Sequence, residues 1–261
     1  MEFTSLRYAK AGRVGVMVFD TPAALNAITE LRLREMELLL TEIEADEDLG
    51  ALVITGGEGK AFCVGLDLDL LDRAFDDIIY FETVVRRVNM LITRLEALPI
   101  PTIAAVNGIT RAGGFELTMG CDFVLIADEA RYGDVHTDSG VLPAAASLRL
   151  KRRIGEQRAK EMIWTARWYD GPEAVAAGLA LRSVPRAELQ TTALAFAASL
   201  TDKPRAVIAA NKRVFQQGVD AGLAEGAEIE LRNFVAYMGS EPYGREAYLA
   251  FREGRQPAWK T

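Results

Sequence analysis

The chain has 261 residues, 50% of them hydrophobic, and a formal net charge of −7. This length and apolar content suffice for a sizeable buried core, while the acidic balance argues against nucleic acid as a main partner. The chain has one histidine and two widely separated cysteines, a set without metal-ligand spacing, so we expect no metal site.

The sequence has no basic, apolar leader and no apolar run of the length that crosses a bilayer. We therefore expect a cytoplasmic protein without a membrane partner. In such a reducing compartment Cys63 and Cys121 are expected to be structural thiols.

The first hundred residues alternate between strand and helix patterns, separated by glycine and proline. Apolar residues recur with a period of two in the predicted strands and at helical spacing in the predicted helices. The predicted elements are strands at 2–8, 13–19 and 51–55, helices at 29–45 and 78–98, and a glycine-interrupted loop at 60–68.

The most informative stretch is residues 103–122. The apolar run Ile103–Val106 has the length and content of a buried strand, and Gly113-Gly114 then opens a segment with apolar residues at helical spacing. Backbone N–H groups at a helix N-terminus lack intrahelical partners and carry the positive end of the helix dipole, so this junction can hold an oxyanion. Glu116 lies one turn into the helix, within reach of a group that reacts beside that anion.

Each part of this stretch also has a simpler interpretation. A glycine pair at a strand–helix junction is often only a turn, and a glutamate in a first helical turn often only compensates the helix dipole. The surroundings of the stretch therefore decide its meaning.

The second half of the chain changes from mixed to helical character. Repeating strand–helix alternation followed by a helical tail predicts an α/β core with an all-helical C-terminal part. The predicted elements are strands at 123–127 and 181–184, a polar segment at 134–143, helices at 144–165 and 172–178, and helix from 186 to the end with breaks at 202–204 and 240–242.

Five blocks of sequence occur in one order along nearly the whole chain: Thr21–Ala27, Lys60–Leu68, Pro101–Asp122, Arg149–Ala159 and Ala250–Arg255. The first three contain P-A-A-L-N-A, K-A-F-C-V-G-L-D-L and A-A-V-N-G-I-T-R-A-G-G-F-E-L. In this order and at this spacing, the blocks resemble the signatures of the crotonase (enoyl-CoA hydratase/isomerase) superfamily.

The resemblance implies an α/β fold, a crotonase-like spiral of β-β-α repeats with two roughly perpendicular sheets. It also implies a C-terminal helical trimerisation region, so that the protein forms a homotrimer or a dimer of trimers. We expect the crotonase-fold core over residues 1–198 and the helical oligomerisation region over residues 199–261.

The chemistry implied by the resemblance is stabilisation of the enolate of an acyl-CoA thioester by two backbone N–H groups. These match Val64 and Gly113 of this chain. CoA enters as part of the substrate, and no other cofactor is expected. The resemblance assigns CoA and substrate binding to Lys60, Ala61, Phe62, Cys63, Gly65, Asp67, Leu68 and Gly114.

The catalytic positions depart from the family pattern. Hydratases of the superfamily use two glutamates; Glu116 matches the first, and His136 falls where the second is expected. An imidazole exchanges protons near neutral pH, so we assign His136 a catalytic role. If the segment is extended, Asp138 points the same way as His136 and can orient it, although a solvated loop carboxylate explains Asp138 equally well. Other departures are Arg111 for an apolar residue, Ala112, Ala144 and Ala146 for glycines, and Val135 for a proline.

These observations predict an acyl-CoA-processing enzyme of the enoyl-CoA hydratase/isomerase type. A first alternative is a CoA-independent β-diketone hydrolase, because His136–Pro143 is similar to the histidine and S-G-x-x-P of that branch; its acidic residue after the proline is missing here, where Ala144 follows. A second alternative is a non-catalytic binding subunit of the same fold, against which the presence of Glu116 argues.

Overall fold

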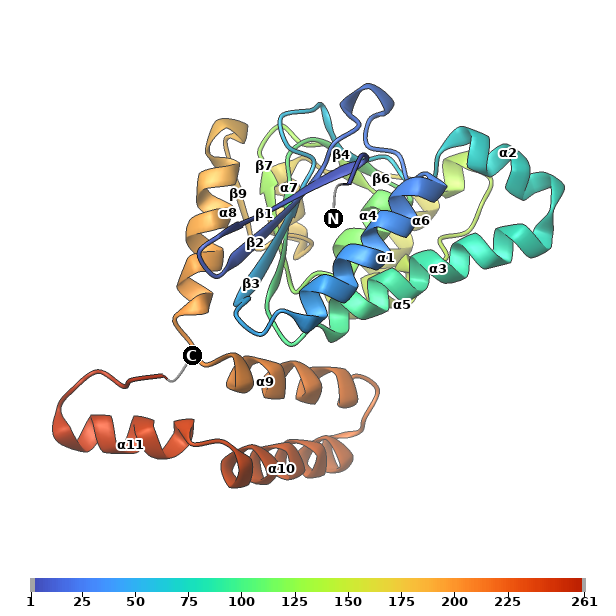
Figure 1. The fold of residues 1–261 in the computed structure, drawn as a ribbon. Helices are drawn as coiled ribbons and strands as arrows, with labels where there is room; N and C mark the ends of the chain where they lie inside the picture. The colour runs from blue at the N-terminus through green and yellow to red at the C-terminus, as the bar shows by residue number, and fades with distance from the viewer. Residues whose placement is uncertain (1–2, 260–261) are drawn as a thin grey trace.

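The computed structural model describes residues 3–259 and contains a main sheet of six strands (Figure 1). The first two strands are antiparallel, and every later strand is parallel to its neighbour. In spatial order the strands are β1 (Leu6–Ala11), β2 (Val14–Phe19), β3 (Ala51–Thr55), β5 (Thr102–Val106), β7 (Phe123–Ala127) and β9 (Arg182–Val184).

A second, smaller sheet consists of three very short parallel strands. They are β4 (Ala61–Cys63), β6 (Ile109–Arg111) and β8 (Tyr132–Gly133). Each follows a strand of the main sheet along the chain, so the chain alternates between the two sheets. The sequence does not predict these strands, because two or three residues are too few to show a period.

Helices complete the repeating unit, and the predicted spiral of β-β-α repeats is confirmed. The pair β3–β4 is followed by α2 (Leu68–Asp76) and α3 (Ile78–Ala97), β5–β6 by α4 (Gly113–Met119), and β7–β8 by α5 (Ala146–Ile154) and α6 (Glu156–Thr165). The opening unit is a hairpin of the main sheet, β1–β2, followed by the short 3-10 helix η1 (Pro22–Ala24) and α1 (Glu30–Ala45).

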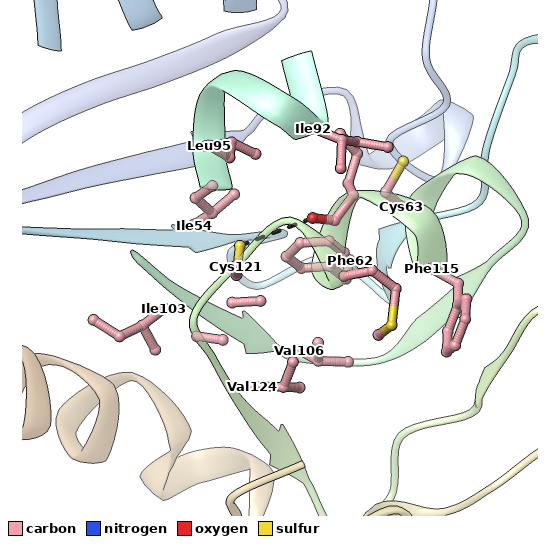
Figure 2. Close-up of a cluster of buried hydrophobic side chains, with 14 of the residues drawn as sticks. Ile54, Phe62, Cys63, Ile92, Leu95, Ile103, Val106, Phe115, Cys121 and Val124 are labelled. Carbon is pink, nitrogen blue, oxygen red and sulfur yellow. Dashed lines mark hydrogen bonds between the residues drawn. The ribbon is translucent and has the colours of Figure 1, made fainter. Parts of the chain in front are cut away.

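The part of the core drawn in Figure 2 lies between the main sheet and the helices α3 and α4, and the same buried cluster includes one face of α1. Both cysteines are buried in it as free thiols. Burial raises the pKa of Cys63 to about 11 and that of Cys121 to about 12, so neither forms a reactive thiolate at neutral pH. The labelled members of the cluster are Ile54, Phe62, Cys63, Ile92, Leu95, Ile103, Val106, Phe115, Cys121 and Val124.

Three predicted elements differ in the structure. The first strand spans Leu6–Ala11 instead of 2–8, and residue 2 lies outside the described residues. The loop predicted at 60–68 contains β4 and leads into α2, a helix that the sequence did not predict. The helix predicted at 144–165 is divided at Gly155, whose φ of +81° favours glycine and ends α5.

The chain leaves the core later than predicted. The division at residue 198 falls inside α8 (Arg186–Thr201), which packs against β3, β5 and β7 and so belongs to the core. Between α6 and α8 the chain forms α7 (Gly171–Ala177) and β9. After α8, the helices α9 (Arg205–Gln217), α10 (Leu223–Ser240) and α11 (Tyr243–Glu253) form a separate tier below the core in Figure 1.

The C-terminal tier has an unusually apolar exposed surface. On α10 the exposed residues Leu231, Phe234, Val235 and Met238 recur at intervals of three and four, which places them on one face of the helix. Ile229, on the same helix, is buried within the chain. Within residues 3–259, no helix has the length and apolarity that a membrane span requires.

Candidate active site

The three strands of the small sheet end at one cavity. Because β4, β6 and β8 are parallel, their carboxyl ends share an edge. The residues that follow them, Val64, Ala112–Gly113 and Val135–His136, line a cavity of about 300 Å³. Helices α2 and α3 supply an apolar wall made of Leu68, Leu71, Phe75, Phe81, Val85 and Val88. The topology thus assembles residues that are far apart in the sequence.

Two backbone N–H groups lie at one wall of this cavity without an acceptor among the described residues. They belong to Val64, directly after β4, and to Gly113, the first residue of α4. Their chain segments touch, since a Cβ added to Gly65 would lie 2.9 Å from the Gly113 nitrogen. Two unpaired donors on adjoining backbone, one of them at a helix N-terminus, form a site suited to an oxyanion.

Glycines permit this contact between the β4 loop and α4. A Cβ on Gly114 would lie 2.0 Å from the carbonyl oxygen of Cys63, so any larger residue would push the two segments apart. Gly65 has a φ of +92°, a backbone conformation that residues with a side chain rarely adopt. Ala112 has a φ of +47° at the position where the resemblance expects a glycine, and the backbone is strained there.

Two buried asparagines hold the chain that leads into β4. The Asn26 amide nitrogen donates to the carbonyl of Ala61 at 3.0 Å, and Asn107 accepts from the Gly56 N–H at 3.0 Å and donates to the Gly59 carbonyl at 2.9 Å. The backbone of Ile28 also pairs with the loop after β4. The sequence contains both asparagines within family blocks but does not indicate this anchoring role.

Glu116 lies buried at the cavity, with 3% of its surface exposed. Its Oε1 accepts hydrogen bonds from the backbone N–H groups of Ala145 at 2.6 Å and Ala146 at 3.1 Å, at the start of α5. Its Oε2 accepts no hydrogen bond from the described residues and remains available to a ligand. Burial disfavours the charged form and raises the pKa of Glu116, although His136 and the two N–H donors oppose this shift.

His136 is paired with a carboxylate that the sequence analysis did not single out. Its Nδ1 lies 3.0 Å from Oδ1 of Asp134, and Asp134 is completely buried. Burial lowers the pKa of His136, but the hydrogen bond to Asp134 and the charges of Asp134 and Glu116 outweigh this effect, so its pKa is raised. Val135, between the two, has a φ of +53°, an uncommon conformation for a β-branched residue.

Asp138 does not occupy the place expected for it. Residues Thr137–Ser139 form the 3-10 helix η2, so the prediction of an extended segment is wrong. Asp138 is exposed, and the described residues include no hydrogen bond between it and His136. Asp134, two residues before the histidine instead of two after it, is the carboxylate that contacts the imidazole.

Glu116, Asp134 and His136 each place one ligand-type atom within 4.8 Å of the others. This set of two carboxylates and one imidazole has the donor types that a divalent cation accepts. However, Glu116 Oε1 already accepts two backbone N–H groups, and His136 Nδ1 is bonded to Asp134 Oδ1. The same side chains are of the types that exchange protons with a bound ligand.

The structure places the other predicted binding residues in two settings. Leu68 lines the cavity, whereas Ala61, Phe62 and Cys63 turn into the core, where the Phe62 ring packs at 5.4 Å on that of Phe19. Asp67 caps α2. The predicted contacts between this loop and CoA, including that of the exposed Lys60, stay predictions.

Comparisons with known proteins agree with this geometry. Residues 9–261 match the family model described as enoyl-CoA hydratase/isomerase. A probable enoyl-CoA hydratase of Mycobacterium bovis is 34% identical, with 98% of each chain covered. A short-chain-enoyl-CoA hydratase of Clostridium acetobutylicum is 30% identical, over 98% of this chain and 97% of that one.

A solved structure supports the same assignment. The enoyl-CoA hydratase of Bacillus anthracis superposes with a TM-score of 0.92 at 29% identity, over 98% of this chain and 99% of that one. The match therefore extends over the core and the C-terminal helices together. The chain belongs to the enoyl-CoA hydratase/isomerase family and has the crotonase fold.

Proposed function

We propose that this protein is an acyl-CoA-processing enzyme that adds water to an α,β-unsaturated thioester through an enolate. The observation that carries the proposal is the meeting, at one cavity, of two unpaired backbone N–H groups with the Glu116 and His136 pair. The names of the relatives, probable enoyl-CoA hydratase and short-chain-enoyl-CoA hydratase, support this reaction class.

The N–H groups of Val64 and Gly113 would bind the thioester oxygen. When the acyl chain is attacked, negative charge moves onto that oxygen, so donors fixed in advance stabilise the transition state more than the ground state. One such donor typically contributes about 3–4 kcal/mol, so two supply much of the stabilisation that enolate formation needs.

Glu116 and His136 would divide the proton transfers. A water that bonds both groups at about 2.8 Å spans a gap of the size found here. The Glu116 carboxylate takes one proton of this water, its oxygen bonds to C3 of the acyl chain, and the C2=C3 electron pair moves into the thioester as an enolate. Protonated His136 then donates its proton to C2, and proton transfer from Glu116 to His136 restores the starting state.

Asp134 favours the acid role of His136. A buried carboxylate bonded to Nδ1 stabilises the imidazolium and fixes the orientation of the ring. The raised pKa of His136 favours its protonated form, which is the form that an acid requires. His136 would then have the role that the second glutamate has in the hydratases that the chain resembles.

The Asp134–His136 pair also supports a second candidate, the CoA-independent hydrolysis of a β-diketone. A carboxylate-held histidine can remove a proton from water that attacks a ketone carbonyl, and the neighbouring C–C bond then breaks to leave an enolate. This reaction needs His136 as a base, whereas hydration needs it as an acid. The two candidates therefore differ in their pH dependence and in their need for CoA.

The first prediction concerns the two proton-transfer groups. Glu116→Gln and His136→Ala should each lower kcat on enoyl-CoA substrates by about 10²–10⁴-fold, because each removes a proton transfer from the slow steps. Steady-state kinetics on enoyl-CoAs of several chain lengths, with calorimetric CoA-thioester binding of each variant as the control for folding, measure the effect.

A folded His136→Ala variant with the wild-type kcat would contradict the assignment of His136 as the acid. Turnover of cyclic diketones without turnover of any thioester would favour the hydrolase. Thioester binding without turnover of either class would indicate a binding subunit.

The second prediction concerns the protonation of His136. Since it is the chain's only histidine, its imidazole resonance in an NMR titration needs no assignment. Its pKa should lie above the ordinary value of 6.5 and should fall in Asp134→Asn, while the matched variant Asp138→Asn leaves it nearly unchanged. If His136 is the acid, activity falls as the pH rises through this pKa. An equal effect of both substitutions, or activity that rises with deprotonation, would contradict the assignment.

We also propose that the chain forms a trimer or a dimer of trimers through its C-terminal tier. The exposed stripe Leu231, Phe234, Val235 and Met238 on α10 is the kind of apolar surface that soluble proteins cover by association. The resemblance, which includes the helical tail, supports the same assembly.

The third prediction follows from that stripe. Sedimentation at micromolar concentration should give three or six times the 28.6 kDa mass of the chain. Phe234→Asp should dissociate the assembly, whereas Glu230→Asp on the same helix should leave it intact. A stable wild-type monomer at these concentrations would exclude the proposed assembly.

A further inference from the structure

Arg111 introduces a cation into a cavity that is otherwise lined mainly by apolar side chains. It is the last residue of β6 and precedes the Ala112–Gly113 junction by one position. Among the described residues that line the cavity, Arg111 is the only arginine or lysine. The resemblance expects an apolar residue here, so the general reaction of the family does not account for this charge.

The side chain of Arg111 has the freedom to meet a ligand. Side chains alternate along a strand, and the preceding Thr110 is completely buried, with its hydroxyl bonded to the Gly108 carbonyl. Arg111 therefore emerges on the opposite face, where it is exposed. The described residues give its guanidinium neither an ion pair nor a hydrogen bond, whereas Arg149 on α5 is paired with Glu96 at 2.7 Å.

An acyl group that fills the cavity would take water away from this guanidinium. A desolvated cation is costly unless an anion pairs with it, and a planar guanidinium matches a carboxylate with two parallel hydrogen bonds. A carboxylate in the cavity would need such a cation, because Glu116 and Asp134 are acidic and the chain has a net charge of −7. The cation and a carboxylate-bearing ligand therefore complement each other.

We propose that Arg111 selects acyl-CoA substrates whose acyl group ends in a carboxylate. This inference rests on the proposed function, because it places the thioester oxygen at the N–H groups of Val64 and Gly113. Arg111 is two residues from Gly113, so their Cα atoms lie within about 7 Å of each other. The guanidinium can thus reach a carboxylate a few carbon atoms from the thioester, which corresponds to a short dicarboxylic acyl chain of about four to six carbons.

The experiment compares two enoyl-CoAs of equal length, one ending in a carboxylate and one in the corresponding carboxamide. The wild-type protein should prefer the carboxylate by about 10- to 100-fold in kcat/KM. Arg111→Leu should abolish this preference, so that kcat/KM for the carboxylate and for the carboxamide lie within about threefold of each other, and Arg111→Lys should retain part of it. Arg131→Leu is the matched control: Arg131 lies beside β8, stacks on Trp168 and does not line the cavity, so the preference should survive.

A second arm separates the acyl carboxylate from the phosphates of CoA, which are also anions. The same acyl groups are presented as pantetheine thioesters, which lack the CoA diphosphate and the ribose phosphate. Preference for the carboxylate should persist with these substrates and should still depend on Arg111. If Arg111→Leu instead weakens all CoA thioesters equally and leaves pantetheine thioesters unaffected, Arg111 binds phosphate and the proposal is overturned.

Calorimetric binding of the saturated analogues distinguishes a failure of the proposed function from a failure of the inference about Arg111. Failure of every thioester to bind would refute the proposed function and this inference together. Binding of thioesters without discrimination between carboxylate and carboxamide would refute the inference alone. If the wild-type protein binds the carboxylate more tightly than the carboxamide and Arg111→Leu removes this difference, the inference is supported even where turnover is slow.

Discussion

The site depends on a direct backbone contact between the loop after β4 and the N-terminus of α4. Gly65, Gly113 and Gly114 let the two segments approach so closely that a Cβ at Gly114 would lie 2.0 Å from the Cys63 carbonyl oxygen. Only at this separation can the N–H groups of Val64 and Gly113 serve one oxygen atom. The parallel small sheet, the asparagine anchors and the buried core of Figure 2 all hold this contact in place.

The buried charged groups of the site each have hydrogen-bond partners that offset the cost of their burial. Two backbone N–H groups at the start of α5 hold Glu116, and Asp134 and His136 hold each other. The exception is Oδ2 of Asp134, a buried oxygen without a hydrogen-bond partner among the described residues. A buried oxygen without a partner lowers the stability of the folded protein. The positive φ of Val135 is a second unfavourable feature, and both lie where the chemistry is proposed.

Much of this architecture follows from the sequence. Glycine spacing and hydrophobic pattern predict the strand–turn–helix unit at Ile103–Met119, and the resemblance supplies the spiral fold and the positions Val64 and His136. The sequence could not distinguish Asp134 from Asp138, because both lie two residues from the histidine and the choice depends on the positive φ of Val135 and the 3-10 turn that follows. The sequence also did not indicate the helix α2. The apolar residues Leu68, Leu71 and Phe75 of this helix line the cavity.

The most direct test of this account is a crystal structure of the protein with butyryl-CoA, a saturated thioester that cannot be hydrated. The account predicts that the thioester oxygen lies about 2.7–3.1 Å from both the Val64 and the Gly113 nitrogens, with C2 and C3 of the acyl chain beside Glu116 and His136. A thioester oxygen bound elsewhere, or bonded to only one of these nitrogens while the acyl chain leaves the cavity, would contradict it.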